Sequence, residues 1–455
     1  MTVETQRTRR IVAPEPADPP SLERGVRQLL AQKISGTLVG VWLLIAEHLR
    51  LGTWDLLRAW TGDPGSGLAP RLALQVIHEA ALCVTRSRKE NSLSQRGFEV
   101  ANGLPFVVTD EAVHHQFDAV SVAETELLQL NLGRLRRASG HFQGGLLALD
   151  PHHLRSFTRR QMRGHRHHEG DPAVKTLRTF FCFDAHTCQP VAFTLGSAAR
   201  TVAQATPELL GLVAGILNPA PGQALVVADS EHYTVDILTC VRNHSPFDLL
   251  CPLPRGRTIQ KKLAALPDSL FTRRWAGMAT ARLPYSFREA PALPLHQILQ
   301  RTGETAADYH FTPFLSTSAR DDLQQLCDDY PARWHVEEFF NSYQAMGWNR
   351  AGTLNLNIRY AQLTMALIAQ AVTYPLRRRL GDPYRNWEAS HFAKHLLQGL
   401  DGDIRVHGDT IRVTLYNAPP HLASHYQGLP AKLEAEAVDP RVPWLYNFKL
   451  DFAFK

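Results

Sequence analysis

Hydrophobic positions recur with helical spacing through the first third of the chain. From Ser21 to about Arg137 this pattern predicts amphipathic helices, with a break at Gly-Leu-Pro (103–105). A new helix is expected near Thr109, whose side chain can cap it ahead of two acidic residues that suit the helix dipole. Residues 1–20 include the proline-rich segment 13–20, which has nothing to bury, and are predicted to be a disordered tail. We therefore expect a tail followed by an all-α region over 21–140.

Near residue 143 the pattern changes to short apolar runs of strand length. Strands are predicted for the run ending at Asp150, for 177–185, for 190–195, for the run ending at Asp229 and for 247–253, with helices at 207–217 and 232–241. The resulting order is β, β, β, α, β, α, β. This order favours an α/β fold in which a mixed sheet carries helices on its faces.

The segment 254–315 interrupts this alternation. It is richer in Pro and Arg, and its one alternating stretch, 275–285, indicates some β-structure, so we interpret it as an insertion. Helical pattern resumes at 316, where Ser318 and Asp321 resemble a capping box. The predicted core therefore comprises 141–253 and 316–380.

Helix signals continue toward the C-terminus. Pro331 suits the first turn of a helix that Gly347 would end, and 354–380 reads as one long, mostly apolar helix. The region 381–455 contains a predicted β-hairpin at 404–416, turning at His407-Gly408-Asp409. We regard 381–455 as a candidate for oligomerisation.

Composition excludes several classes of protein. Hydrophobic residues make up 44% of the 455 and charged residues 20%, which is enough for a sizeable core and excludes wholesale disorder. The longest apolar run, 36–46, is too short to cross a bilayer, and the N-terminus lacks the apolar stretch of a secretion signal. Six cysteines without a CxxC pair are typical of reduced, mostly buried thiols in the cytoplasm. A net charge of +6 is compatible with a nucleic-acid partner without establishing one.

Two carboxylates follow buried strands in the same context. In open α/β sheets, functional sites lie at such strand ends. A single aspartate there would most often be a turn cap, but two of them, Asp150 and Asp229, favour a functional site.

A polar stripe marks the segment 330–344. On one helix, Tyr330, Arg333, Glu337, Asn341 and Gln344 would share a face, because they are spaced by three and four residues. A solvated surface helix is the ordinary meaning of such a face. The aromatic residues of the same segment instead favour burial, and a buried polar stripe must be paired with something.

These residues resemble the DDE transposases of bacterial insertion sequences. That family's hallmark is Tyr, two residues, Arg, three residues, Glu, six residues, Lys, which Tyr330, Arg333 and Glu337 match. Asp150 and Asp229 match its other two carboxylates in order, at separations of 79 and 108 residues, and the family carries a β-rich insertion in the second gap. The segment 309–317 is also similar, and the resemblance covers roughly 100–415.

Two positions depart from the family pattern. Gln344 stands in place of the family's Lys, and Glu231 stands two places after Asp229, where a small residue is usual. Glu338 adjoins Glu337 but would point about 100° away on a helix, so only one of the two can join the site.

The resemblance implies an RNase H-like core and a metal-dependent enzyme. Asp150, Asp229 and Glu337 would bind two Mg²⁺ or Mn²⁺ ions, which suit oxygen ligands and can cut a DNA end and join it to target DNA. Arg333 would bind a phosphate, as would Tyr330 and Gln344, and Trp275 could stack on a flipped base, although a strand Trp is more often core. The helices of 21–137 would bind terminal inverted repeats. The implied assembly is a homodimer on paired ends, in the bacterial cytoplasm at the nucleoid and with no membrane.

Alternatives remain open at this point. The His-rich stretch 152–175 fits a basic loop on DNA or a solvated loop, and a zinc site at His165, His167, His168 and Glu169 is conceivable. For the whole chain, the rivals to an active transposase are a decayed or domesticated DNA-binding protein and a stand-alone nuclease on the same fold.

Overall fold

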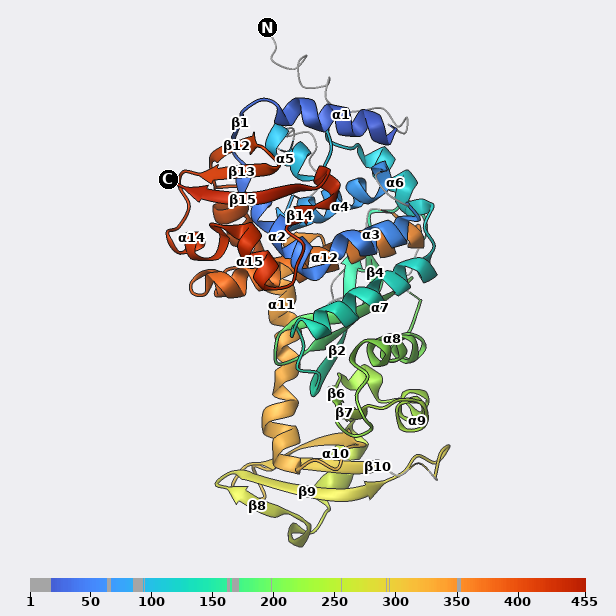
Figure 1. Cartoon of the computed structure of the whole chain (residues 1–455). Coiled ribbons are helices and arrows are strands. Elements are labelled where there is room, and N and C mark those ends of the chain that lie inside the picture. Colours follow the sequence, from blue (N-terminus) through green and yellow to red (C-terminus); the bar gives the residue numbers. More distant parts are fainter. Residues whose placement is uncertain are drawn as a thin grey trace. The chain divides into compact units, whose positions relative to one another are not determined.

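The chain forms two compact units in the computed structural model. The structure describes residues 18–63, 67–84, 93, 95–161, 164–165, 172–197, 199–254, 256–291, 293, 295–349 and 353–455. One unit comprises Met1–Arg136 and Phe340–Lys455, and the other comprises Arg137–Phe339 (Figure 1). No helix within these described ranges is both long and apolar enough to cross a membrane.

The first unit begins with helices, as its periodicity predicts. They are α1 (Pro19–Leu30), α2 (Trp42–Leu51), α3 (Thr53–Thr61), α4 (Leu68–Ala81), α5 (Arg96–Ala101), α6 (Asp110–Asp118) and α7 (Val122–Ala138). Thr109 caps α6 as expected. Two predictions need correction: β1 (Ile34–Gly36) interrupts the all-α region, and α1 already begins at Pro19, within the predicted tail, whose residues 1–17 lie outside the described residues. Asp18 caps α1, whose first residues are prolines, and this arrangement suits a helix start.

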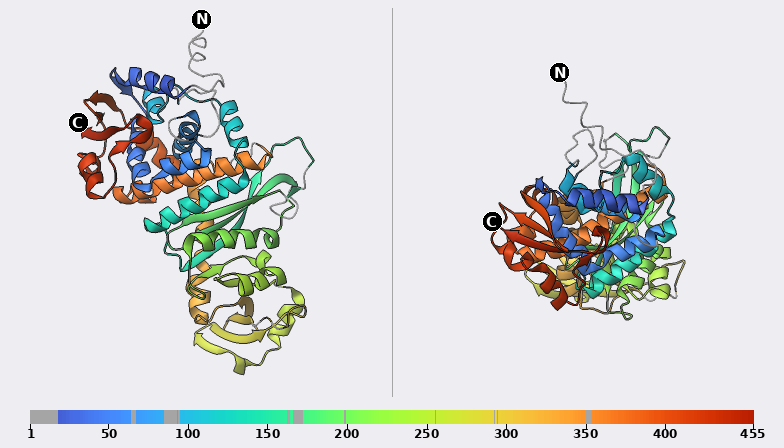
Figure 2. Two further views of the ribbon diagram at one scale, coloured as in Figure 1. Left: turned by 45° about the vertical axis from the view of Figure 1, so that its right-hand side comes forward. Right: turned by 45° about the horizontal axis from the view of Figure 1, so that its top comes forward.

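The long helix α12 (Leu356–Leu380) lies at the centre of the first unit. Asn355 caps its start, and most of its side chains are buried. It packs on α2, α4 and α6, and Figure 2 shows it surrounded by these segments and by the C-terminal elements. The sequence groups 316–380 with the α/β core, whereas in the structure α12 packs with helices of the first unit, which cover its apolar surface.

The C-terminal part of the first unit contains a five-stranded sheet. Besides β1, its strands are β12 (Gly402–His407), β13 (Thr410–Leu415), β14 (Arg441–Val442) and β15 (Phe448–Phe454), in the order β1-β12-β13-β15-β14. The predicted hairpin is confirmed: β12 and β13 pair antiparallel up to His407 and Thr410, and Gly408 has a φ of 63° in the turn. Short helices α13 (Ala389–Phe392), α14 (His421–Tyr426) and α15 (Leu429–Ala435) accompany the sheet.

The second unit is built on a mixed sheet flanked by helices, as predicted. Its core strands are β2 (Leu146–Arg155), β3 (Gly164–His165), β4 (Val174–Asp184), β5 (Gln189–Gly196), β6 (Leu225–Val227) and β7 (Asp248–Pro252). Strand β2 pairs antiparallel with β4 and parallel with β6, which pairs parallel with β7. Helices α8 (Val202–Leu217) and α9 (Val235–His244) fall between strands in the predicted order. Helix α8 starts one turn before Pro207, because Thr201 and Gln204 form a capping box.

The predicted insertion continues the core sheet. After α10 (Arg257–Ala264), strands β8 (Thr272–Trp275), β9 (Met278–Tyr285), β10 (Leu295–Thr302) and β11 (His310–Ser316) pair antiparallel, and β11 pairs with β7. Leu263 of α10 packs with Ala281 and Leu299 of the strands. The alternating stretch 275–285 therefore spans two strands, with Gly277 at a φ of 73° between them.

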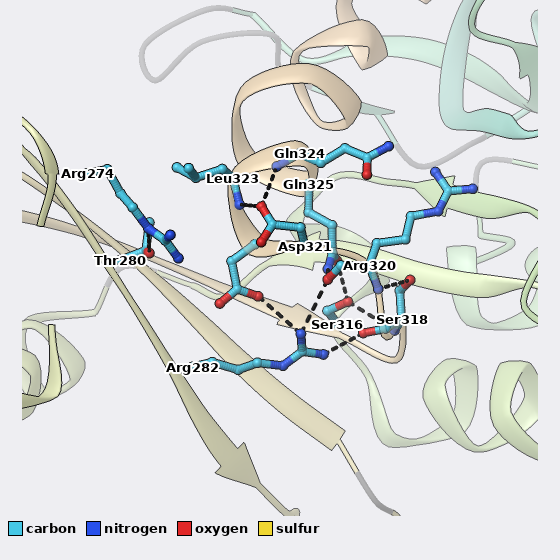
Figure 3. Close-up of polar contacts among 11 residues, drawn as sticks. Arg274, Thr280, Arg282, Ser316, Ser318, Arg320, Asp321, Leu323, Gln324 and Gln325 are labelled. Carbon is cyan, nitrogen blue, oxygen red and sulfur yellow. Dashed lines mark hydrogen bonds and ion pairs between the residues drawn. The ribbon is translucent and has the colours of Figure 1, made fainter. Parts of the chain in front are cut away.

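The segment from Gln324 to Met346 changes its helical geometry three times. It runs through a π-helix (η7, Gln324–Asp329), a 3-10 turn (η8, Pro331–Trp334), α11 (His335–Tyr343) and another 3-10 turn (η9, Gln344–Met346). Two predictions are therefore corrected. The stripe from Tyr330 to Gln344 is not one α-helical face, and the capping box of Ser318 and Asp321 does not form. Asp321 itself accepts hydrogen bonds from the backbone amides of Leu323 and Gln324 (Figure 3).

Candidate active site

The parallel pairing of β2 with β6 brings two aspartates side by side. Ala148 is paired with Val227, and two residues further along each strand are Asp150 and Asp229. Asp150 and Asp229 are 79 residues apart in the sequence, as are the paired residues Ala148 and Val227, so the two aspartates occupy equivalent positions along the two strands. The prediction that Asp150 ends its strand is wrong, because pairing with β4 continues β2 to Arg155. Only the parallel half of the pairing stops before Asp150.

Asp150 lies in a poorly hydrated and negatively charged environment. Its side chain is 19% exposed, and it shares a sheet face with Phe181, the residue opposite it on β4. The pKa of Asp150 is raised to about 7, chiefly by burial; Arg333 opposes this rise, and the charges of Asp229, Glu337 and Glu231 add to it. The carboxylates of Asp229, Glu337 and Glu231 therefore all lie within electrostatic range of Asp150.

Asp229 is held by the turn that follows it. Its Oδ1 accepts hydrogen bonds from the Glu231 amide at 3.0 Å and from His232 Nδ1 at 2.8 Å, and the His232 side chain is only 3% exposed. Burial would raise the pKa of Asp229, but these hydrogen bonds outweigh burial and the pKa lies below its usual value. The two neighbouring aspartates thus have pKa values shifted in opposite directions, a pattern that occurs at catalytic sites.

Glu337 reaches the aspartates through Arg333. The guanidinium lies 3.3 Å from Asp150 Oδ1 and 3.7 Å from Glu337 Oε1. The Glu337 side chain is 47% exposed on α11. Tyr330 packs edge-on against Phe314 with ring centroids 4.8 Å apart, and burial raises the pKa of its hydroxyl while Arg333 opposes this. Arg333 is thus the shared counter-ion of two of the three predicted metal ligands.

Two further glutamates, Glu231 and Glu338, lie close in sequence to the predicted metal ligands Asp229 and Glu337. Glu231 pairs with Arg178 at 2.8 Å and is half exposed. Glu338 contributes to raising the pKa of Cys188, after burial, whereas the carboxylate of α11 that acts on the pKa of Asp150 is Glu337. The expected difference in direction between Glu337 and Glu338 is therefore present.

The donor set fits a hard cation, but the side chains do not form a closed metal cage. Among the described residues, no three His, Cys, Asp or Glu side chains are arranged to hold a metal ion. Arg333 provides positive charge between Asp150 and Glu337. The oxygen atoms of Asp150, Asp229 and Glu337 are the ligands that Mg²⁺ and Mn²⁺ prefer, and their mutual repulsion favours cation binding.

The predicted DNA contacts lie in different places. Trp275 is 52% exposed on β8, so it is not a core residue, and Gln344 is exposed beyond α11 in the first unit. Two exposed aromatic residues were missed by sequence reasoning: Phe157 (73%), beneath Arg155 at 5.0 Å, and Trp334 (55%), beneath Arg333 at 5.2 Å. An aromatic residue one or two positions after an arginine is the sequence signal that marks both of them.

The His-rich stretch and the cysteines can be assessed only in part. His167, His168, Glu169 and the side chain of His165 lie outside the described residues. Within the stretch, burial lowers the pKa of His152 to about 4. All six cysteines are free; Cys182 and Cys251 are buried and Cys327 is exposed, so the prediction of mostly buried thiols is too general.

The sequence of residues 141–371 matches the family model described as "Transposase DDE domain". This match covers slightly more than half of the chain. The chain belongs to the DDE transposases. The resemblance drawn from Tyr330, Arg333 and Glu337 is thereby confirmed at the level of the family, and the matched range contains all three predicted carboxylates.

Comparisons with curated proteins and with solved structures say less about this transposase. A search of curated proteins gives no match. One similar solved structure is a cryo-EM structure of a piggyBac transposase synaptic complex with hairpin DNA. It is 9% identical, covers 81% of this chain and 82% of that one, and has a TM-score of 0.43. The family assignment rests on the family model alone.

Proposed function

We propose that this DDE transposase cuts the ends of an insertion sequence and joins them to target DNA by two-metal-ion phosphoryl transfer. The observation that carries the proposal is the β2–β6 register, which brings Asp150 beside Asp229 within electrostatic range of Glu337. Three carboxylates so placed are stabilised by cations, and DNA phosphates require positive charge at the reacting centre.

Asp150, Asp229 and Glu337 would hold the two Mg²⁺ or Mn²⁺ ions. When bound, such ions activate a water or a 3′-OH and stabilise the leaving oxygen of an in-line displacement. The hydrogen bond from His232 orients the Asp229 carboxylate. Arg333 would bind a DNA phosphate through its two Nη groups, and Tyr330 would donate a hydrogen bond to a second phosphate.

DNA recognition is assigned to other parts of the chain. We infer that the helices of 21–140 bind the terminal inverted repeats and that the enzyme acts as a homodimer on paired ends, with 381–455 contributing to assembly. Exposed Trp275 would stack on a base, and Gln344 would hydrogen-bond to a phosphate.

A decayed DNA-binding derivative is the alternative with an observation in its favour. Gln344 lacks the charge of the family's Lys, and Glu231 adds a fourth carboxylate that needs Arg178 as its partner. Against decay, Asp150, Asp229 and Glu337 are all retained. End binding without cleavage in Mg²⁺ or Mn²⁺ would support the alternative, and cleavage without joining would support a stand-alone nuclease.

The deciding experiment is cleavage of a labelled inverted-repeat end by the wild type and by four variants. Asp150→Asn, Asp229→Asn and Glu337→Gln each remove one charge with little change of shape, so cleavage should fall by several orders of magnitude while end binding persists. Glu338→Gln is the matched control and should cleave like the wild type. If the three carboxylate variants retain a cleavage activity that the wild type has, this triad is not the active site.

A further inference from the structure

A loop on the second unit connects the insertion strands to the catalytic segments. Its residues 317–322 follow β11, and Arg282 of β9 donates hydrogen bonds to the carbonyls of Ser318 (2.6 Å) and Arg320 (3.3 Å). Gln325 of η7 donates to the same Arg320 carbonyl at 2.7 Å. Figure 3 shows the loop held by these contacts, with the Arg320 side chain extending away from the Arg282 guanidinium. The backbone of Arg320 is thus fixed from two sides.

The Arg320 side chain contacts three separate segments. Its Nη2 donates to the Gly145 carbonyl at 2.9 Å and to the Gln223 carbonyl at 3.1 Å, and its Nη1 lies 3.4 Å from Asp329 Oδ2. The Gly145 carbonyl also accepts from the Leu225 amide, the first hydrogen bond between β2 and β6. Arg320 therefore sits where the parallel pairing begins.

Each of these segments leads to one carboxylate of the candidate site. Gly145 is five residues before Asp150, Gln223 is six before Asp229, and Asp329 is eight before Glu337. Along a strand, five residues span about 17 Å, so the Arg320 guanidinium lies far from the carboxylate of Asp150. It nevertheless bonds to the start of all three carboxylate-bearing segments.

We propose that Arg320 is a positioning residue that sets the alignment of Asp150, Asp229 and Glu337. One guanidinium with several donors in a fixed plane couples the residues just before β2 and β6 to the end of η7, which leads into α11, so a shift of one segment is transmitted to the others. Metal ions tolerate little displacement of their ligands, and a misplacement of about 1 Å can cost about 100-fold in rate. This inference rests on the proposed metal-dependent function.

A purely structural role would have a different signature. If Arg320 only stabilised the unit, its loss would lower the melting temperature and leave the folded fraction fully active. If it positions the carboxylates, folded protein should bind Mn²⁺ more weakly and cleave more slowly, while binding to end DNA stays unchanged.

The test compares Arg320→Gln and Arg320→Lys with Arg200→Gln in the full chain. Arg200 is a matched control, because its side chain is similarly buried and also contacts a carbonyl and a carboxylate, those of Leu195 and Glu208, but bridges no carboxylate-bearing segments. We expect Arg320→Gln to weaken Mn²⁺ binding, followed by electron paramagnetic resonance, about 10-fold and to slow end cleavage about 100-fold. Arg320→Lys should be intermediate, because one ammonium cannot hold all three partners in the same plane.

Chemical rescue separates positioning from folding. Arg320→Gln removes the guanidinium from the Gly145 and Gln223 carbonyls and from the Asp329 carboxylate, and a free guanidinium ion can donate to the same acceptors. Millimolar guanidinium should restore part of the cleavage by Arg320→Gln and leave Arg200→Gln unchanged.

The outcomes against the inference are distinct. Wild-type Mn²⁺ affinity and cleavage in Arg320→Gln, or equal losses in Arg200→Gln, would overturn the role of Arg320 while the proposed function stands. A wild-type chain that neither binds Mn²⁺ nor cleaves DNA would overturn the proposed function and this inference together.

Discussion

The two units treat buried charge in opposite ways. In the first, the fully buried Glu47 is bonded by Arg50 (2.9 Å), Arg379 (3.2 Å) and the hydroxyl of Tyr426 (3.0 Å). In the second, the mostly buried Asp150 shares one arginine with Glu337 and faces further carboxylates. Cations surround the buried acid of the first unit, whereas acids predominate around that of the second. The first arrangement stabilises a fold, and the second fits the cation site proposed above.

The largest stability effect should follow from breaking the Glu47 network. Glu47→Gln leaves Arg379 without its carboxylate and Arg50 with Glu436 alone, so we expect a loss of about 3 kcal/mol. Hydrogen exchange of peptides from α2 and α12 would report the loss locally. Unchanged exchange in these helices would show that the network does not stabilise the first unit.

The same kind of substitution at Asp150 should have the opposite sign. Asp150→Asn removes an ionised group that burial disfavours, and a pKa shift from 3.8 to about 7 corresponds to roughly 4 kcal/mol. This shift already includes the favourable Arg333 pair, and burial of the Asn amide offsets part of the gain, so we expect an increase in stability of about 1–2 kcal/mol at pH 8 without metal. Exchange of β2 and β4 peptides measures it. A loss of stability would mean that the Arg333 ion pair outweighs burial and repulsion.

The pH dependence of the two units should differ for the same reason. The pKa of Asp150 is raised on folding, so its contribution is fully present below pH 4 and is lost as the pH rises toward about 7. In the first unit, burial lowers the pKa of His78 to about 4, so its contribution is present above about pH 6.5 and is lost as the pH falls through 4. Hydrogen exchange measured from pH 4 to 8 should therefore show that lowering the pH slows exchange in β2 and speeds exchange in α4. If the exchange rates of β2 and α4 changed with pH in the same direction, the proposed difference between the two units would be wrong.

The smallest effect is expected at Glu231. The Glu231 side chain is half exposed in its pair with Arg178, so Glu231→Gln should change stability by less than about 1 kcal/mol. The variant also tests the difference between the two units, because the charge of Glu231 contributes to the raised pKa of Asp150. If Glu231→Gln lowered the free energy of unfolding by several kcal/mol, the pair with Arg178 would stabilise the fold as the Glu47 network does.

Much of the fold could be predicted from the sequence because its signals are local. The order of strands and helices from β2 to β7, the cap of α6, the extent of α12 and the β12–β13 hairpin follow from periodicity, capping side chains and turn residues. The three carboxylates could be selected because each follows or occupies a recognisable element. Such signals depend on residues that lie within a few positions of one another.

Only the tertiary structure decided which distant segments meet. Asp150 lies within β2 because β4 continues the pairing, α12 belongs with the first unit because α4 covers it, and the insertion extends the core sheet through β11. The partners of Arg333 and Arg320 lie up to 183 residues away in the chain. Contacts at such separations produce no periodic pattern in the sequence. An arginine that binds a distant carbonyl cannot be distinguished, from the sequence alone, from an arginine exposed to water.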